Sequence, residues 1–564
     1  MALLWPVFLV SAAVLGFEIS LLRILLVASW HHFAFLVISV ALLGFGASGT
    51  VLAVARSFLI PRSTAAVFWL TLATTVSMPI CCAAAQWIPV ESRFVPVLFW
   101  GQMAQWVLFW IILGIPFFLG ASAIGLALMV AHERLPRIYA ANLVGSGAGA
   151  LLAPTVMEFV PPEWLPTAWA TPALAAAFLL AFGAVRTRVG SIVVAVIVVS
   201  VWGVARPPEI RCDSYKYGAY VQRLVDQGSA ERLGEAAYGP RGVVEIYSGD
   251  VFHDVPFVSG EVAPPRAHAL VIDGHRAGSI LVVRAPADAR VVDGTLMSVP
   301  YALVPPSPKV LLLGERSGVN VWLAVRRGAE SIHVVQPDSN VFAILRRSGS
   351  AGEAVLDSPG VKAVVMEPRH FVERSREQFD VVQVAELESS AAGSGGIGGM
   401  AQDFVTTVEG FASCLRRLSP NGILAVTRGI QTPPRDNVKL LATVVRSLEE
   451  LGRESPNRFI AIVRDYLAVC TMVKVTPWTS AEVATLRQLI SARGLTPVWF
   501  PGIESAELNY PDQLPGPPNG IGDWYHHCAV RLFSEEARRF IDSWPFDVRP
   551  TTDRSFSTSA SWNR

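Results

Sequence analysis

The chain has 564 residues, a length that predicts two to four domains, and its formal net charge of +1 gives no reason to expect nucleic acid as a partner. Hydrophobic residues make up 52% of the chain and charged residues 16%, which is more apolar than an ordinary globular protein, and almost all the excess precedes residue 206. The six cysteines show no C-x-x-C spacing, so neither a metal site nor a disulfide framework is expected.

Apolar runs in residues 1–206 predict a bundle of membrane-spanning helices. A span needs about 20 residues, and seven spans is the simplest count. Glycines cluster in two of the runs, at residues 44–49 and 145–149, where small side chains allow helices to pack closely. The runs lie at about residues 4–28, 33–58, 65–88, 97–131, 138–160, 166–185 and 189–205.

Arginines in alternate loops predict the orientation of this bundle. The positive-inside rule places these loops and the N-terminus in the cytoplasm. Seven spans would then leave the chain after residue 206 outside the cell, whereas six or eight would leave it in the cytoplasm. The sequence therefore leaves the side of the soluble part open. The arginine pairs are Arg56 and Arg62, Arg134 and Arg137, and Arg186 and Arg188.

Two charged residues, Glu18 and Arg23, stand inside the first predicted span. A charge in the middle of a membrane costs about 2.5–3.5 kcal/mol on insertion scales, so both side chains should face the bundle or a partner. Two interpretations stay open. The pair forms a polar site within the bundle, or Arg23 extends to the membrane surface while Glu18 is hydrogen-bonded to a neighbouring helix.

Residues 207–300 predict a small antiparallel β-domain. Apolar residues alternate there in strand fashion, and Asp273-Gly274 between two such runs is a strong signal for a two-residue hairpin turn. A helix is expected over residues 295–303, leading into the last part of the chain.

Residues 301–564 predict a Rossmann-like α/β domain. The apolar run at residues 310–313 fits a strand of a parallel sheet that is covered on both faces, and Gly314 marks a tight turn before a short helix and a second strand. Ligands of such units lie over the strand ends and the helix N-terminus. Further strands are expected at about 361–366, 379–385, 423–427, 466–474 and 496–500, with helices at about 404–418, 439–451 and 480–493.

Short motifs follow one another along the chain in a specific order. They resemble those of spermidine synthases, the polyamine aminopropyltransferases related to class I methyltransferases. The whole chain is similar to the bacterial membrane-fused branch of that family. The motifs are residues 15–23 and 137–149, then Ser214-Tyr-Lys216, Ile272-Asp-Gly274, Ser298-Val-Pro-Tyr301, Phe379-Asp-Val-Val-Gln383, Thr406-Thr-Val-Glu-Gly-Phe411 and Pro550-Thr-Thr-Asp553-Arg554-Ser-Phe556.

The resemblance implies a multi-pass protein of the bacterial inner (plasma) membrane that moves an aminopropyl group from decarboxylated S-adenosylmethionine to an amine. A methyltransferase that uses S-adenosylmethionine itself is the alternative reaction. The implied partners are the lipid bilayer, a small amine or polyamine, and either a second copy of the chain or a membrane-complex partner; no metal is implied. Carboxylates are needed because they attract the amine and accept its proton.

The family's functional positions can be carried over one by one. The glycine loop, the ribose-binding acid, the acid after the third strand and the catalytic acid after the fourth strand correspond to Gly314 and Gly318, Gln336, Glu367 and Glu388, with Glu386 as a nearby substitute for the last. Residues 389–400, rich in glycine, serine and alanine, are expected to form a loop over the strand ends.

Several of these positions depart from the family pattern. Glu315 and Arg316 replace glycines where a nucleoside would approach the backbone, Gln336 replaces a carboxylate, and Ala385 stands where the fourth strand normally delivers an aspartate. A second hypothesis is therefore a degenerate domain that binds a ligand or partner without this chemistry. A third is a transporter-like bundle regulated by the domain, motivated by the charges in the first span.

Two polar residues near the predicted sheet are expected to have structural roles. Asp380, at the start of a strand, should end that strand or cap a turn. Tyr301 matches the family motif only loosely, so packing is the favoured interpretation of its role.

Overall fold

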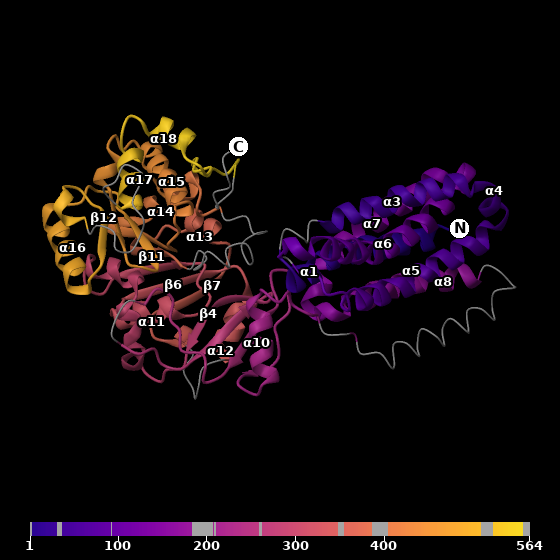
Figure 1. Cartoon of the computed structure of the whole chain (residues 1–564), viewed down its shortest axis with the longest axis horizontal. Coiled ribbons are helices and arrows are strands. Elements are labelled where there is room, and N and C mark those ends of the chain that lie inside the picture. Colours follow the sequence, from indigo (N-terminus) through magenta and orange to yellow (C-terminus); the bar gives the residue numbers. More distant parts are fainter. Residues whose placement is uncertain are drawn as a thin grey trace. The chain divides into compact units, whose positions relative to one another are not determined.

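The structure is a computed structural model that describes residues 3–30, 36–91, 93–182, 207, 210–258, 262–347, 355–385, 404–508 and 523–555. The chain forms two compact units, shown in Figure 1. The first unit contains residues 1–223 and 236–243, and the second contains residues 224–235 and 244–564.

Apolar helices build the first unit. Six helical segments of the described chain are long and apolar enough to cross a membrane, and they coincide with the first six predicted spans. The seventh, at residues 189–205, lies outside the described residues. The main helices, indigo to purple in Figure 1, are α1 (Leu4–Ala28), α3 (Leu36–Val54), α5 (Ser63–Ala85), α6 (Phe99–Met129), α7 (Leu135–Phe159) and α8 (Leu165–Phe182). Short turns between them are α4 (Arg56–Leu59), η1 (Ile60–Arg62), η2 (Pro96–Leu98), η3 (His132–Arg134) and η4 (Pro162–Trp164).

Helices α1 and α7 pack with their backbones in contact. A Cβ atom on Gly145 would lie 2.3 Å from the carbonyl oxygen of Phe8, and one on Gly149 would lie 2.3 Å from that of Ala12. No side chain fits into such a gap, so the two glycines permit the close approach of the helices.

The other glycines of the two predicted clusters differ in their surroundings. A Cβ atom on Gly44 would lie 2.9 Å from Cβ of Phe117, so this residue also serves helix packing. Gly46, Gly49 and Gly147 have no atom of the described structure within 4 Å of such a Cβ. Helix packing therefore explains some glycines of each cluster and leaves the others facing away from their neighbours.

The charged residues of the first span lie on α1. Arg23 is only 5% exposed, and Glu18 is half-buried. Between them, the buried hydroxyl of Ser20 accepts a hydrogen bond of 2.8 Å from Nε1 of Trp169 on α8. The side chain of Arg23 is thus buried among the residues of this unit, as a polar site within the bundle would require.

A buried lysine closes the C-terminal end of α1. Lys216 is 1% exposed, and its Nζ donates hydrogen bonds to the carbonyl oxygens of Leu26 at 2.7 Å, Val27 at 2.8 Å and Ser29 at 3.0 Å. The last carbonyls of a helix have no partner within the helix, and a cation is favoured beside them. Lys216 therefore satisfies the end of α1 from a distant part of the sequence.

The second unit begins with the expected small antiparallel sheet. Its Asp273-Gly274 turn is confirmed: the two residues have φ of 52° and 71° and join strands whose ends pair Ile272 with His275. A two-residue hairpin of this type requires positive φ at both positions, which this residue pair tolerates. The four strands, in spatial order, are β1 (Glu231–Arg232), β2 (Val244–Ser248), β3 (Ala267–Ile272) and β4 (His275–Leu281), preceded in the chain by α10 (Tyr217–Asp226).

An eight-stranded sheet forms the Rossmann-like part of this unit. The spatial order is β12-β10-β11-β9-β8-β5-β6-β7, and the five strands from β9 to β7 are parallel. Strand β11 is antiparallel to β9 and to β10, and β12 is antiparallel to β10. The strands are β5 (Lys309–Leu313), β6 (Ser331–Gln336), β7 (Val361–Val365), β8 (Phe379–Val384), β9 (Leu418–Gly429), β10 (Ile460–Arg464), β11 (Ala468–Val473) and β12 (Thr496–Trp499).

Helices cover this sheet and complete its core. Phe379 of β8 and Phe411 of α14 are fully buried within one large apolar cluster. Burial of such side chains contributes about 1.5–3 kcal/mol each, so this cluster is a main source of the unit's stability. The helices are α11 (Val319–Arg326), α12 (Ser339–Arg347), α13 (Pro368–Arg374), α14 (Val408–Arg416), α15 (Asp436–Glu450), α16 (Ser480–Arg493), α17 (Trp524–Leu532) and α18 (Ala537–Ser543), with short 3₁₀ turns η9 (Val355–Asp357), η10 (Pro456–Arg458) and η11 (Ser505–Glu507).

The predicted helix at residues 295–303 is a 3₁₀ helix, η7 (Leu296–Ala302), which follows another, η6 (Pro286–Gly294). Pro300 within η7 has no N–H to donate, so it does not support a regular α-helix there. These two segments connect the small sheet to β5.

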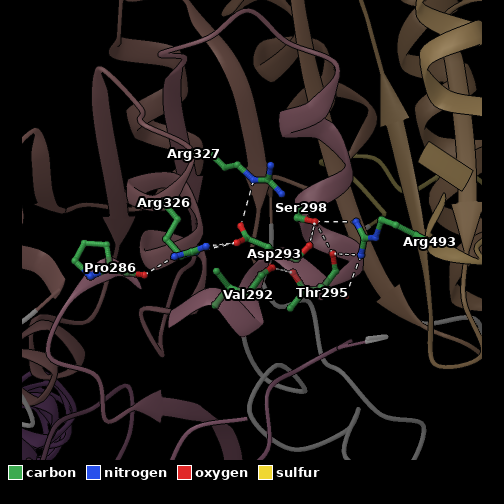
Figure 2. A network of polar contacts seen from close by, with 9 residues as sticks. Pro286, Val292, Asp293, Thr295, Ser298, Arg326, Arg327 and Arg493 are labelled. Atoms are coloured by element: carbon green, nitrogen blue, oxygen red, sulfur yellow. Dashed lines mark hydrogen bonds and ion pairs between the residues drawn. The ribbon is translucent and has the colours of Figure 1, made fainter. Parts of the chain in front are cut away.

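Arginines from two helices hold the 3₁₀ segments in place (Figure 2). Asp293 of η6 accepts a hydrogen bond of 2.9 Å from Nε of Arg326 and lies 3.4 Å from Nε of Arg327. From α16, Arg493 donates to Oγ of Ser298 at 2.8 Å and to the carbonyl oxygen of Thr295 at 2.9 Å. The segments before β5 are therefore tied to elements on both sides.

Candidate functional site

The order of the parallel strands reverses at one point, and we term the carboxyl-end edge of the sheet at that point the crevice. From β5 the chain moves to β6 and β7 on one side and then returns to β8 on the other. Ligands of open α/β sheets bind where the strand order reverses in this way. Here that point lies between Gly314, after β5, and Ala385, after β8. The amide of Ala385 donates to Leu313 at 2.9 Å, and a Cβ atom on Gly314 would lie 3.7 Å from the carbonyl oxygen of Ala385.

Both predicted glycines of the loop after β5 are required by the backbone. Gly314 has φ of 80° and Gly318 has φ of 81°, in the left-handed region that other residues enter only with strain. A Cβ atom on Gly318 would also lie 2.8 Å from Cγ1 of Val355. Turn geometry therefore accounts for these glycines without a ligand.

Glu315 is folded into this loop. Its side chain is fully buried, and Oε1 accepts hydrogen bonds from the backbone N–H groups of Ser317 at 3.0 Å and Gly318 at 2.7 Å. Oε2 accepts from Nδ2 of Asn320 at 2.6 Å. The carboxylate thus occupies the positive N-terminus of α11. This differs from the sequence-based expectation that Glu315 adds bulk and charge where a nucleoside would approach.

Gln336 joins the end of β6 to the same loop. It is 5% exposed, its Nε2 donates to the carbonyl oxygen of Glu315 at 3.0 Å, and its Oε1 accepts from the backbone N–H of Asp338 at 3.3 Å. A carboxamide has two N–H groups and an oxygen with two lone pairs, so these bonds leave one of each. The structure therefore places Gln336 beside the loop that contains Gly314 and Gly318, where its hydrogen bonds hold the loop to the end of β6.

Glu367 lies one strand further along the same edge. It is exposed and stands at the N-cap of α13, directly after Met366, whose N–H donates to the carbonyl oxygen of Gln336 at 3.2 Å. The predicted binding residues therefore lie in sequence along the carboxyl ends of β5, β6 and β7.

A polar cluster near this edge joins motifs that are far apart in the sequence. Asp553 of the C-terminal motif accepts a hydrogen bond of 2.7 Å from Oγ1 of Thr407 and lies 3.5 Å from Nη2 of Arg369. The N–H of Asp553 donates to Glu409 at 3.0 Å. The sequence shows the motifs that contain Thr407 and Asp553 as separate segments, and no local pattern indicates that they are in contact.

The predicted catalytic carboxylates, Glu386 and Glu388, lie outside the described residues, as does the predicted loop at residues 389–400. Strand β8 ends at Val384, so both carboxylates follow the strand that borders the crevice. Among the residues that the structure describes, no group of three or more His, Cys, Asp or Glu side chains could hold a metal ion.

Two other residues take the structural roles expected of them. Asp380 accepts hydrogen bonds from the N–H of Lys309 at 2.9 Å and from Oγ of Ser419 at 2.6 Å, at the opposite end of the strands from the crevice. Tyr301 is buried and donates to Oε1 of Gln383 at 3.2 Å. Its burial, together with nearby negative charge, raises the pKa of Tyr301 far above its ordinary value, so the phenol stays neutral.

The chain matches no protein-family model and no curated protein sequence. Among solved structures it is similar to spermidine synthase from Thermotoga maritima, with 14% identity and a TM-score of 0.31 over 44% of this chain and 75% of that one. It is also similar to spermidine synthase in complex with the transition-state analogue AdoDATO, with 13% identity and a TM-score of 0.31 over 44% of this chain and 75% of that one. A third similar structure is human methyltransferase-like protein 13 in complex with SAH, with 13% identity and a TM-score of 0.25 over 35% of this chain and 89% of that one. Identities and scores this low support no inference about function.

Proposed function

We propose that the protein is a membrane-anchored transferase that moves a carbon group from an adenosyl sulfonium to an amine. The observation that carries the proposal is the crevice at the reversal of strand order, bordered by Gly314 and Ala385, with Gln336 and Glu367 at the neighbouring strand ends. Aminopropyl transfer from decarboxylated S-adenosylmethionine is the reaction implied by the motif order. Methyl transfer from S-adenosylmethionine is the alternative.

The residues at the crevice fit the nucleoside of such a donor. Gly314 places no side chain there, and the buried carboxylate of Glu315 is turned into the loop, away from an incoming ligand. The remaining hydrogen-bonding positions of Gln336 would hold ribose hydroxyls, and Glu367 would add a second acceptor. A neutral carboxamide binds hydroxyls more weakly than a carboxylate, so we expect modest affinity for the nucleoside.

The bound sulfonium would supply an electrophilic carbon beside a positively charged sulfur. In this proposal Glu388, with Glu386 nearby, attracts the cationic acceptor and takes the proton that the amine loses. The acceptor is a small amine or polyamine, because two acidic side chains after β8 favour a cation.

Binding and product formation by the full-length, detergent-purified protein test this proposal. Isothermal titration with methylthioadenosine and both sulfoniums should give saturable heats, and incubation with an amine should give an alkylated product by mass spectrometry. Glu388→Gln should abolish the product while binding of methylthioadenosine persists. Absence of any binding at millimolar ligand would overturn the proposal.

A non-catalytic binding domain is the second candidate, and one observation favours it. The Glu315 carboxylate and the Gln336 carboxamide satisfy the loop internally, so the loop is stable without a cosubstrate. Product formation that disappears in Glu388→Gln would refute this candidate. Saturable binding of methylthioadenosine without any alkylated product would favour it.

The side of the membrane bears directly on the choice between the two. We propose a location in the bacterial inner membrane, where a sulfonium made in the cytoplasm reaches the second unit only from the cytoplasmic side. Reporter fusions after residues 62, 188 and 564 would fix that side. An outside location would favour the non-catalytic candidate.

A further inference from the structure

One guanidinium stands at the crevice. Within the loop after β5, Glu315 and Ser317 are 0% and 1% exposed and form hydrogen bonds inside the loop, whereas Arg316 between them is partly exposed. Arg316 follows Gly314 by two residues in this loop, and part of its surface stays exposed. Arg316 forms no hydrogen bond or ion pair with any residue in the described ranges.

Among the described residues, no acidic side chain is paired with Arg316. The adjacent carboxylate of Glu315 already accepts four hydrogen bonds, from Ser317, Gly318 and Asn320. The residue across the loop, Gln336, is neutral and donates to the carbonyl oxygen of Glu315. A free cation beside a binding site raises the affinity for ligands with a negative group there and lowers it for purely cationic ones.

The two sulfonium donors differ in this property. S-adenosylmethionine carries a carboxylate together with its ammonium and sulfonium groups, whereas its decarboxylated form carries only the two positive groups. The planar guanidinium of an arginine can bind a carboxylate through two parallel hydrogen bonds. At a partly exposed site, these two bonds add more binding free energy than the attraction of a single ammonium charge would. Decarboxylated donor would meet only repulsion from the same group.

We infer that Arg316 binds the carboxylate of the donor and thereby selects S-adenosylmethionine over its decarboxylated form. This inference rests on the proposed function, because it assumes that an adenosyl sulfonium occupies the crevice. It also changes which group is transferred: the donor delivers a methyl or a 3-amino-3-carboxypropyl group in place of an aminopropyl group.

Either transfer balances without an additional reactant. The lone pair of the amine forms the new C–N bond as the C–S⁺ bond breaks, and the electron pair of that bond stays on sulfur. The leaving group is the neutral thioether S-adenosylhomocysteine for methyl transfer, or methylthioadenosine for transfer of the longer group. The amine's proton passes to a carboxylate or to water, and nothing is oxidised or reduced.

Titration of the full-length protein with three ligands tests the inference. Wild type should bind S-adenosylmethionine at least about tenfold more tightly than the decarboxylated form. Arg316→Gln should remove that preference while leaving the affinity for methylthioadenosine, which lacks the carboxylate, within about twofold. Arg316→Lys should keep part of the preference because it keeps the charge. Arg374→Gln, an exposed arginine on α13, is the matched control and should change none of the three affinities.

The outcomes separate this inference from the proposed function. If no ligand binds, methylthioadenosine included, the proposed function fails and this inference fails with it. If methylthioadenosine binds but the two sulfoniums bind equally, or the preference survives in Arg316→Gln, only the role of Arg316 is overturned. Unchanged thermal unfolding of Arg316→Gln shows that a lost preference is not a folding defect.

Discussion

Two stretches of the chain carry glycines with the same spacing of four residues, one in helix α7 and one after strand β5. In α7, Gly145 and Gly149 have ordinary helical backbone and are needed because another helix lies against them. After β5, Gly314 and Gly318 are needed because their own φ angles are positive. The same spacing therefore reports on a neighbour in one place and on the local backbone in the other, and the surrounding pattern decides which.

The largest effect is expected where a side chain would meet another backbone. Gly149→Leu should separate α1 from α7 and destabilise the first unit by about 3 kcal/mol or more, because backbone atoms cannot move aside as a side chain can. Thermal unfolding and size-exclusion chromatography in detergent measure this. Gly147→Leu, with open space around it, is the control and should resemble wild type. Equal behaviour of the two variants would contradict the packing role.

A smaller loss is expected at the turn. Gly318→Ala meets both an unfavourable φ of 81° and the side chain of Val355, and should cost about 2–4 kcal/mol. Gly328→Ala shares the positive φ, at 67°, but has open space, so it should cost only about 1–2 kcal/mol. The difference between the two, from urea unfolding, isolates the contact with Val355. No difference would mean that φ alone sets the requirement.

Replacing the Glu315 carboxylate, which closes the turn, should lower the free energy of unfolding by less than Gly318→Ala does. Glu315→Gln keeps one oxygen acceptor but turns an amide group toward Nδ2 of Asn320, so one buried donor loses its partner. We expect a loss of about 1–3 kcal/mol in the free energy of unfolding. Ser317→Ala is the control, since its hydroxyl makes the longest of the four hydrogen bonds described for the Glu315 carboxylate, at 3.3 Å. A stable Glu315→Gln variant would show that the loop does not depend on the carboxylate.

The smallest effect depends on pH and concerns the strand that delivers Gln336 to the loop. His333 of β6 is 4% exposed, with its ring near those of Phe371 and Phe379, and burial lowers its pKa below the ordinary 6.5. The folded state therefore favours the neutral ring while the unfolded chain binds a proton below pH 6.5. Stability should be complete above that pH and fall below it. His333→Gln should flatten this dependence between pH 7 and pH 5 in urea titrations; an unchanged slope would exclude His333 as its source.

Much of the fold could be predicted because it depends on local pattern. The apolar runs of β5, β6 and β8 and the Asp273-Gly274 turn contain their own signals. Strand β10 was missed, since its short apolar run ends at Arg464, and a charge usually marks a surface. The structure shows that Arg464 is 1% exposed and ion-paired with Asp523, which is equally buried. That partner lies 59 residues away, so no local pattern could show it.

For the candidate site, the sequence pattern indicates which described residues lie near one another but not the hydrogen bonds that they form. A glycine turn after a buried strand placed Gly314, Gly318 and Gln336 together, as the structure does. The direction of Glu315 was wrong because it depends on donors that assemble only when α11 forms and Asn320 is brought into the loop. The same holds for Asp553, which meets Thr407 from 146 residues away.

The lysine at the end of α1 has a consequence for the order in which the protein is made. Synthesis proceeds from the N-terminus, so α1 exists long before Lys216, which follows Leu26 by 190 residues. Until then the final carbonyls of α1 need other hydrogen-bond partners, such as water. Helix α1 thus precedes the other described apolar helices in synthesis, yet its end is completed only after all of them have been made.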